Sequence, residues 1–144
     1  MTRTKTILFS IAVVALGAPL AVAIAADAGK TSLAVPAQKY PDVVAAKARA
    51  SGVDTFDFDV TVSSPYDTPK RYADAFRVVG RDGTVFGERT LWHDHADEQP
   101  FTRDLHRVVV PRAVRFVIIE ARDKQHGYGG GDGGKAFDLA LPGR

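Results

Sequence analysis

Cysteine is absent from this chain of 144 residues, and methionine and tryptophan occur once each. The absence of cysteine excludes disulfide bonds, a cysteine nucleophile and metal sites built on thiolates. An excess of one charge is also lacking. Two of the 19 basic residues, Arg3 and Lys5, precede residue 27, which leaves 17 basic and 17 acidic side chains in the rest. Because nucleic-acid binding needs a basic excess, we expect no nucleic-acid partner.

The first 26 residues have the pattern of a secretory signal peptide. A charged start is followed by an apolar run over 7–16, and then by Ala-x-Ala cleavage motifs at 21–23 and 23–25. The alternative is an uncleaved anchor, since residues 7–26 carry no charge and are long enough to span a bilayer. Pro19 and the small residues around it favour cleavage. We therefore predict a bacterial protein of the periplasm or the medium, with no stable membrane span after cleavage.

Residues 27–53 have weak signals of regular structure. Glycine, serine and proline near the start of this segment predict an extended, partly disordered linker. The alanine-rich stretch 42–50 follows Pro41 and precedes Gly52, which predicts a short helix.

Strict alternation of apolar and polar residues begins after residue 53. Phe56, Phe58, Val60 and Val62 share one face of the stretch 55–62, which predicts a half-buried strand. Further strands are predicted over 72–79, 84–92, 104–110, 114–121 and 136–141. The unbroken apolar run 116–119 predicts a central strand buried on both faces. The glycine-rich stretch 127–134 predicts a loop.

These strands predict the fold class. Short strands joined by turns, with no helical period among them, indicate an all-β domain over 54–142. We expect an immunoglobulin-like β-sandwich of about seven strands, and a monomer.

The stretch from Trp92 to Glu98 contains the strongest candidate site. If the preceding strand continues through it, His93 and His95 project from the same face, about 6.5–7 Å apart at the backbone. Two such imidazoles can converge on one metal ion, and Glu98 can add an oxygen ligand. His126 would complete the set if the fold brings the two loops together. These residue types predict zinc or copper(II), and the alternative is a solvated acidic loop.

Three residues are candidates for contact with a partner protein. Phe101 could be an anchor that a partner buries, with Arg103 beside it. In the alternative, Phe101 fills the end of the sandwich while Glu98 pairs with Arg103. Tyr128, the aromatic residue of the glycine-rich loop, is the third candidate.

A set of short motifs between residues 54 and 142 resembles a group of small exported bacterial β-sandwich proteins to which no activity is assigned. The motifs are Thr55-Phe56-Asp57, Ser63-Ser64-Pro65-Tyr66-Asp67, Arg71-Tyr72-Ala73-Asp74, Asp82-Gly83-Thr84-Val85, His93-x-His95, Glu98-Gln99-Pro100-Phe101-Thr102-Arg103, Ala121-Arg122-Asp123 and His126-Gly127-Tyr128-Gly129-Gly130. The resemblance implies that the segments 93–103 and 123–130 belong to one signature and meet in space.

The sequence contains none of the common catalytic motifs, such as Gly-x-Ser-x-Gly or His-Glu-x-x-His, and we assign no catalytic residue. The prediction is an exported β-sandwich that binds an unidentified protein or small ligand or associates with the cell envelope. A periplasmic zinc- or copper-binding protein is the first alternative. A small secreted enzyme is the second.

Overall fold

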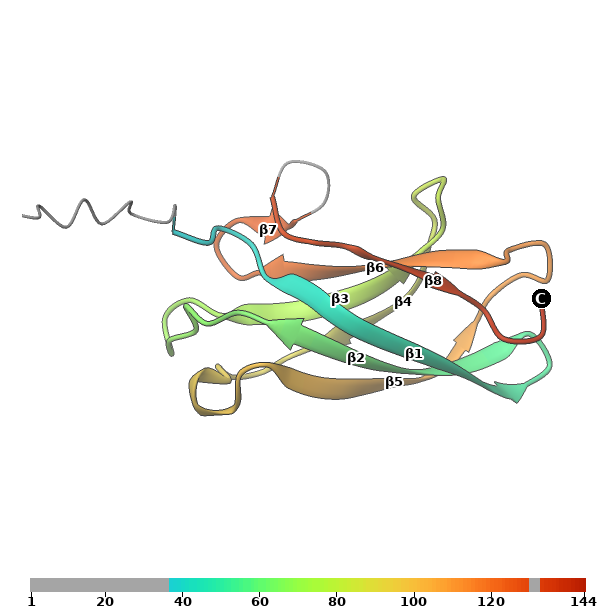
Figure 1. Ribbon diagram of the computed structural model, residues 1–144, viewed down its shortest axis with the longest axis horizontal. Coiled ribbons are helices and arrows are strands. Elements are labelled where there is room, and N and C mark those ends of the chain that lie inside the picture. The colour runs from blue at the N-terminus through green and yellow to red at the C-terminus, as the bar shows by residue number, and fades with distance from the viewer. Residues whose placement is uncertain (1–36, 130–132) are drawn as a thin grey trace, which may run out of the picture. The chain divides into compact units, whose positions relative to one another are not determined.

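The computed structural model describes residues 37–129 and 133–144. The predicted signal peptide and the first part of the predicted linker lie outside the described residues. The described residues form two antiparallel β-sheets that pack face to face (Figure 1). This arrangement confirms the all-β sandwich. Within the two described ranges, no helix has the length and apolar character that a membrane span requires.

The strands divide between a smaller and a larger sheet. The smaller sheet has the order β1-β2-β5, formed by Asp42–Gly52, Thr55–Ser63 and Phe101–Val109. The larger sheet has the order β4-β3-β6, formed by Val85–Thr90, Ala73–Val79 and Phe116–Asp123. Two short strands, β7 (Gly127–Tyr128) and β8 (Phe137–Ala140), pair with successive parts of β6. A 3-10 turn, η1 (Ala96–Glu98), lies between β4 and β5. The chain crosses between the sheets after β2, β4 and β5, as in immunoglobulin-like sandwiches.

The core lies between the sheets and follows from the alternation in the sequence. In β2, Phe56, Phe58, Val60 and Val62 are buried, and the residues between them are half-buried. From the larger sheet, the side chains that pack in the same cluster include Phe76, Val78, Val117, Ile119 and Ala121. Full burial of a valine, isoleucine or phenylalanine side chain contributes about 1.5–3 kcal/mol relative to exposure.

The predicted helix over 42–50 is wrong, because these residues form most of strand β1. β1 pairs with β2 along its length, from Asp42 opposite Ser63 to Gly52 opposite Thr55. Val43 is buried in the core, and Ala46 and Ala48 pack against it. Alanine has the highest intrinsic helix propensity, but the propensity of each residue is worth less than about 1 kcal/mol, and pairing with a strongly alternating neighbour outweighs it here. The sandwich therefore begins before residue 54.

The prediction that the run 116–119 is buried on both faces is also wrong. β6 is an interior strand, with β3 on one side and β8 on the other. Its burial nevertheless alternates, since Val117 and Ile119 are buried while Phe116 is 46% exposed and Ile118 is half-buried. The outer face of an antiparallel sheet is solvated, and here apolar residues occupy part of it.

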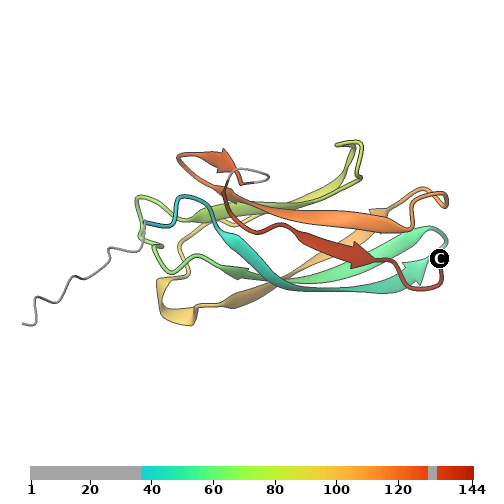
Figure 2. The same ribbon diagram turned by 45° about the horizontal axis from the view of Figure 1, so that its top comes forward.

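The connections between strands gather at the two ends of the sandwich (Figures 1 and 2). The end that we call the aspartate end comprises 37–41, 64–72, 91–100 and 124–126. The opposite end, which we call the arginine end, comprises 53–54, 80–84, 110–115 and 141–144. Both views show the longer strands running between the two ends, whereas the short strands β7 and β8 each accompany only part of β6. The aspartate end thus collects loops that lie far apart in the sequence, including both histidine-containing segments.

Candidate functional site

Asp67 joins two of the loops at the aspartate end. Its side chain is buried, and its two oxygens accept hydrogen bonds from backbone N–H groups on different segments. Oδ1 accepts from Ala73 at 3.1 Å, and Oδ2 accepts from His95 at 3.0 Å. Because His95 belongs to the β4–β5 connection, one carboxylate fixes that loop against the β2–β3 connection. A buried carboxylate needs such donors to offset its lost hydration.

Gln99 makes a second link between the same two loops. Its Oε1 accepts a hydrogen bond from the backbone N–H of Ser64 at 2.7 Å. Its Nε2 donates to Ser64 Oγ at 3.1 Å and to the carbonyl of His95 at 3.2 Å. With Asp67, this amide leaves the β4–β5 connection little freedom.

Asp123, the last residue of β6, organises the other side of the aspartate end. Its side chain is fully buried. Oδ2 accepts a hydrogen bond from Arg71 Nε at 3.0 Å. Oδ1 accepts from the backbone N–H groups of Gln125 and His126, both at 2.9 Å, and lies 2.8 Å from His126 Nδ1. Burial acts to raise the pKa of Asp123, but hydrogen bonds, first of all from His126, outweigh it and hold that pKa below its usual range.

Arg71 extends this network to the segment that precedes β1. Its Nη2 donates to the carbonyls of Gln38 at 3.0 Å and Lys39 at 2.8 Å. The guanidinium also lies over the ring of Tyr66, 4.0 Å from its centroid. Asp123 and Arg71 together therefore hold three separate segments of the chain in fixed positions.

His95 is a buried imidazole with an unsatisfied nitrogen. Its ring stacks on Phe101 with the centroids 3.9 Å apart, and Nδ1 has no hydrogen-bond partner among the described residues. Nε2 lies 4.0 Å from Glu98 Oε1. Burial lowers the pKa of His95, and the positive charge of Arg103 and the proximity of His93 lower it further. His95 is therefore neutral at pH 7.

The structure brings together only part of the predicted metal set. The rings of His93 and His95 lie close, with centroids 4.7 Å apart. They do so within a loop, because β4 ends at Thr90, so the condition that the strand continues through them is not met and the loop brings the rings together instead. The exposed His93 has Nδ1 2.8 Å from the carbonyl of Asp94.

His126 makes a separate set of contacts at the same end of the sandwich. It contacts Asp123 through Nδ1, and its ring meets Tyr40 edge-on at 6.1 Å. Within 37–129 and 133–144, no three histidine, aspartate or glutamate side chains are arranged to hold a metal ion.

Phe101 and Arg103 are arranged as in the alternative given above, in which Phe101 fills the end of the sandwich and Arg103 pairs with Glu98. Phe101 is buried in the core, so its side chain does not reach a partner. Arg103 Nη2 donates to Glu98 Oε1 at 2.7 Å. This ion pair lies on the surface, where solvent and salt screen it.

Tyr128 lies outside the aspartate end, on the outer face of the larger sheet. Its hydroxyl donates to Glu88 at 2.6 Å, and Arg77 lies 3.8 Å above its ring. Burial raises the pKa of Tyr128, and the Glu88 carboxylate raises it further. Tyr128 is thus part of a network of side chains on the surface of the larger sheet. Its role in binding a partner stays a prediction.

Trp92 is the residue that the sequence reasoning missed. Its side chain is 83% exposed, although the adjacent Leu91 is buried. The backbone around it is fixed, since Leu91 N–H donates to the carbonyl of Asp74 at 2.8 Å and Tyr72 Oη donates to the carbonyl of Trp92 at 3.3 Å. The one tryptophan of the chain, placed in a polar stretch, is the signal that could have identified it.

Three surface cavities, of about 370, 230 and 320 Å³, lie away from the aspartate end. The largest and the third are at the arginine end, and the second lies over β1, β2 and β5. None of the three is lined by a histidine. The aspartate end is a set of loops that hydrogen bonds link to one another and that presents side chains such as Trp92 to solvent.

Comparisons with family models, with curated proteins and with solved structures found no match to this chain.

Proposed function

We propose that this protein is an exported binding module of the cell envelope and that its aspartate end recognises a partner protein. The observation that carries the proposal is the exposed Trp92 indole on a loop that buried polar groups hold in place. Export is inferred from the leader pattern of residues 1–26. Kinship with the exported bacterial group is inferred from the shared motifs.

The cost of burying polar groups supports a recognition role for these loops. A sandwich of this size can close its ends with apolar side chains, whereas Asp67 and Asp123 are buried carboxylates that must be fully bonded. Their bonds join the β2–β3, β4–β5 and β6–β7 connections. A loop that is already ordered loses little entropy on binding. A large aromatic side chain on such a loop is typical of residues that dominate binding energy.

Replacement of Trp92 by alanine is expected to weaken partner binding by about 30-fold or more, the effect of losing one dominant contact. The folded state should be unaffected because the indole is exposed. The measurement begins with capture of envelope proteins on the untagged exported form, whose intact mass also reports removal of the leader. The captured protein is then purified and titrated against each variant.

Val53→Ala is the matched control, since Val53 is 88% exposed and lies at the arginine end. It should bind the captured protein as the wild type does. Equal affinity of the Trp92→Ala and wild-type proteins would exclude the aspartate end as the recognition surface.

Binding of zinc or copper(II) by His93 and His95 is the second candidate function. The observation in its favour is the approach of the two rings to 4.7 Å, next to Glu98. Since His126 contacts Asp123, it is not part of this pair.

Any Zn²⁺ or Cu²⁺ binding is accordingly expected to disappear in His93→Ala and to persist in His126→Ala. Isothermal titration of the untagged protein with each metal salt measures this. Loss of binding in both variants would instead indicate that the three histidines act together.

A further inference from the structure

The arginine end contains arginines that no carboxylate neutralises. Within the described residues, Arg81, Arg112 and Arg115 of this end make no ion pair within 4.0 Å, and neither does Arg107 in the last part of β5; all four are exposed. The other described arginines are paired. Two acidic residues lie among these loops. Asp54 pairs with Arg144 at 2.7 Å, and Asp82 accepts hydrogen bonds from Thr84. A formally neutral domain therefore carries a local positive excess at one end.

Exposed apolar side chains accompany these arginines. Val53 in the β1–β2 turn is 88% exposed, Val109 at the end of β5 is 62% exposed, and Phe116 at the start of β6 is 46% exposed. Val85, which follows the β3–β4 hairpin, is 49% exposed. Val109 and Phe116 flank the β5–β6 connection, Val53 lies in the β1–β2 turn and Val85 follows the β3–β4 hairpin, so the four residues are spread over three connections rather than along one groove.

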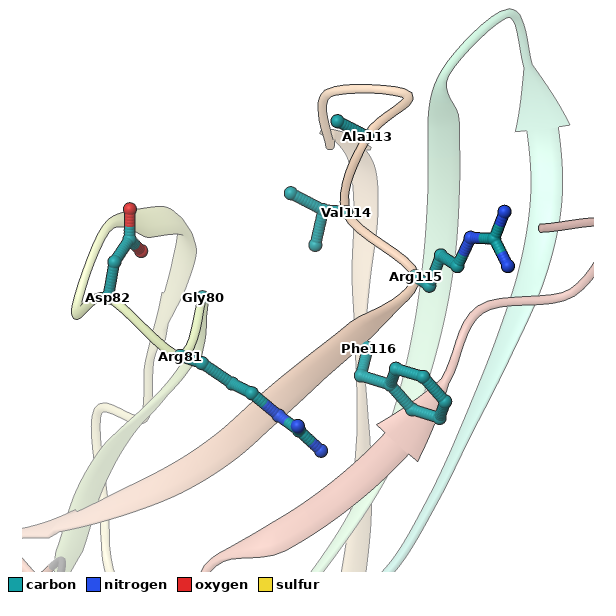
Figure 3. A pocket seen from close by; sticks show the side chains of 7 residues that line it. All are labelled: Gly80, Arg81, Asp82, Ala113, Val114, Arg115 and Phe116. Carbon is teal, nitrogen blue, oxygen red and sulfur yellow. The ribbon is translucent and has the colours of Figure 1, made fainter.

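A groove of about 370 Å³ between the β3–β4 hairpin and the β5–β6 connection combines the two features. Figure 3 shows the Arg81 side chain extending toward the ring of Phe116, while Val114 points into the space between the two loops. The Arg81 guanidinium lies 5.2 Å from the centroid of that ring. Arg115 extends to the other side of its loop (Figure 3). A basic group above an apolar floor suits a ligand that has an anionic head and an apolar body.

We propose that the arginine end docks on the surface of an anionic phospholipid bilayer. The unpaired arginines would contact phosphate groups, and the protruding valines and Phe116 would enter the boundary between headgroups and acyl chains. A flat surface can reach side chains of the β1–β2, β3–β4 and β5–β6 connections at once, whereas an extended acidic peptide would follow a single groove. Docked in this way, the protein presents its aspartate end, with Trp92, away from the membrane.

Sedimentation with phospholipid vesicles tests the proposal. The exported form should bind vesicles of phosphatidylcholine mixed with phosphatidylglycerol, and should not bind phosphatidylcholine alone. Each arginine near such a surface contributes about fivefold to binding, so Arg81→Gln combined with Arg115→Gln should weaken it about 25-fold. Added salt should weaken the binding of the wild type as well, because it screens exposed charges.

Lys39→Gln combined with Lys70→Gln is the matched control, because it removes the same charge from exposed positions at the aspartate end. This variant should bind as the wild type does, and thermal unfolding should show that both double variants are folded. Equal loss in the two double variants, or no binding of the wild type to the anionic vesicles, would overturn the proposal.

Tryptophan fluorescence reports which end of the protein faces the vesicle surface. The emission of Trp92, the one tryptophan of the chain, should stay unchanged when vesicles are added. In a Trp92→Phe background, Phe116→Trp should shift to shorter wavelength as the indole leaves water. A shift of Trp92 itself would place the aspartate end on the membrane and overturn the proposal.

Discussion

Replacement of Asp123 by asparagine is expected to lower the free energy of unfolding by about 3 kcal/mol, a large share of the stability of a small domain. The carboxylate is fully buried and accepts hydrogen bonds from Arg71 and from two backbone N–H groups. Asparagine keeps the shape, but it leaves the Arg71 guanidinium without its counter-charge. Urea unfolding at pH 7, followed by circular dichroism, measures the difference.

Asp97→Asn is the control, since Asp97 is exposed in η1 and its replacement should change stability by less than about 0.5 kcal/mol. Arg71→Gln, alone and with Asp123→Asn, completes a double-mutant cycle, in which the two side chains should be strongly coupled. Additive effects in this cycle would show that the pair does not hold the loops together.

The Asp123 effect should also depend on pH in a defined direction. The pKa of Asp123 is held below its usual range in the folded protein. The contribution of the Asp123 carboxylate to the free energy of unfolding is therefore complete at pH values above its pKa in the unfolded chain, about 3.9. This contribution is lost as the pH falls through the lower pKa of the folded protein. The difference between the wild type and Asp123→Asn should consequently shrink below about pH 4.

The strands that could be predicted from the sequence are those with apolar residues on one face and polar residues on the other. β2 alternates strictly between apolar and polar residues, and the structure buries the predicted face. β1 could not be identified, because a run dominated by alanine has no strong difference between faces and its pairing with β2 is a tertiary effect. The prediction that the run 116–119 is buried on both faces failed for a different reason. Apolar residues on both faces indicate burial, but the sandwich leaves the outer face of β6 partly open.

The candidate site could be predicted only in part, because its contacts are long-range. The motif spacing placed His93 and His95 near one another, and their rings do meet. The bond from Asp67 to the His95 N–H spans 28 residues, and the bonds between Gln99 and Ser64 span 35. No local pattern marks an aspartate or glutamine that will be buried between distant loops. The exposure of Trp92 is the exception, because the polar residues that follow this single tryptophan in the sequence indicate an exposed position.

Acidification below about pH 6.5 is expected to destabilise the wild-type protein through His95, by up to about 1.4 kcal/mol for each pH unit. Burial lowers the pKa of this imidazole, so the unfolded chain takes up a proton before the folded protein does. The contribution of the neutral His95 to stability is therefore complete at pH values above the pKa of the unfolded chain, about 6.5. It falls as the pH decreases toward the lower pKa of the folded protein. Glu98 and Asp67 oppose this shift, whereas Arg103 and His93 increase it. Urea unfolding between pH 8 and pH 5 measures the slope.

His95→Leu should remove most of this slope, because leucine retains the apolar contact with Phe101 and the backbone bond to Asp67 but cannot titrate. It should also stabilise the protein at low pH, since the variant no longer buries the unsatisfied Nδ1. His106→Gln is the matched control, because His106 is 54% exposed and its loss should leave the slope in place. If His95→Leu kept the full slope while His106→Gln lost it, the acid sensitivity would belong to the surface of β5. The buried imidazole would then act only as packing for the β4–β5 loop.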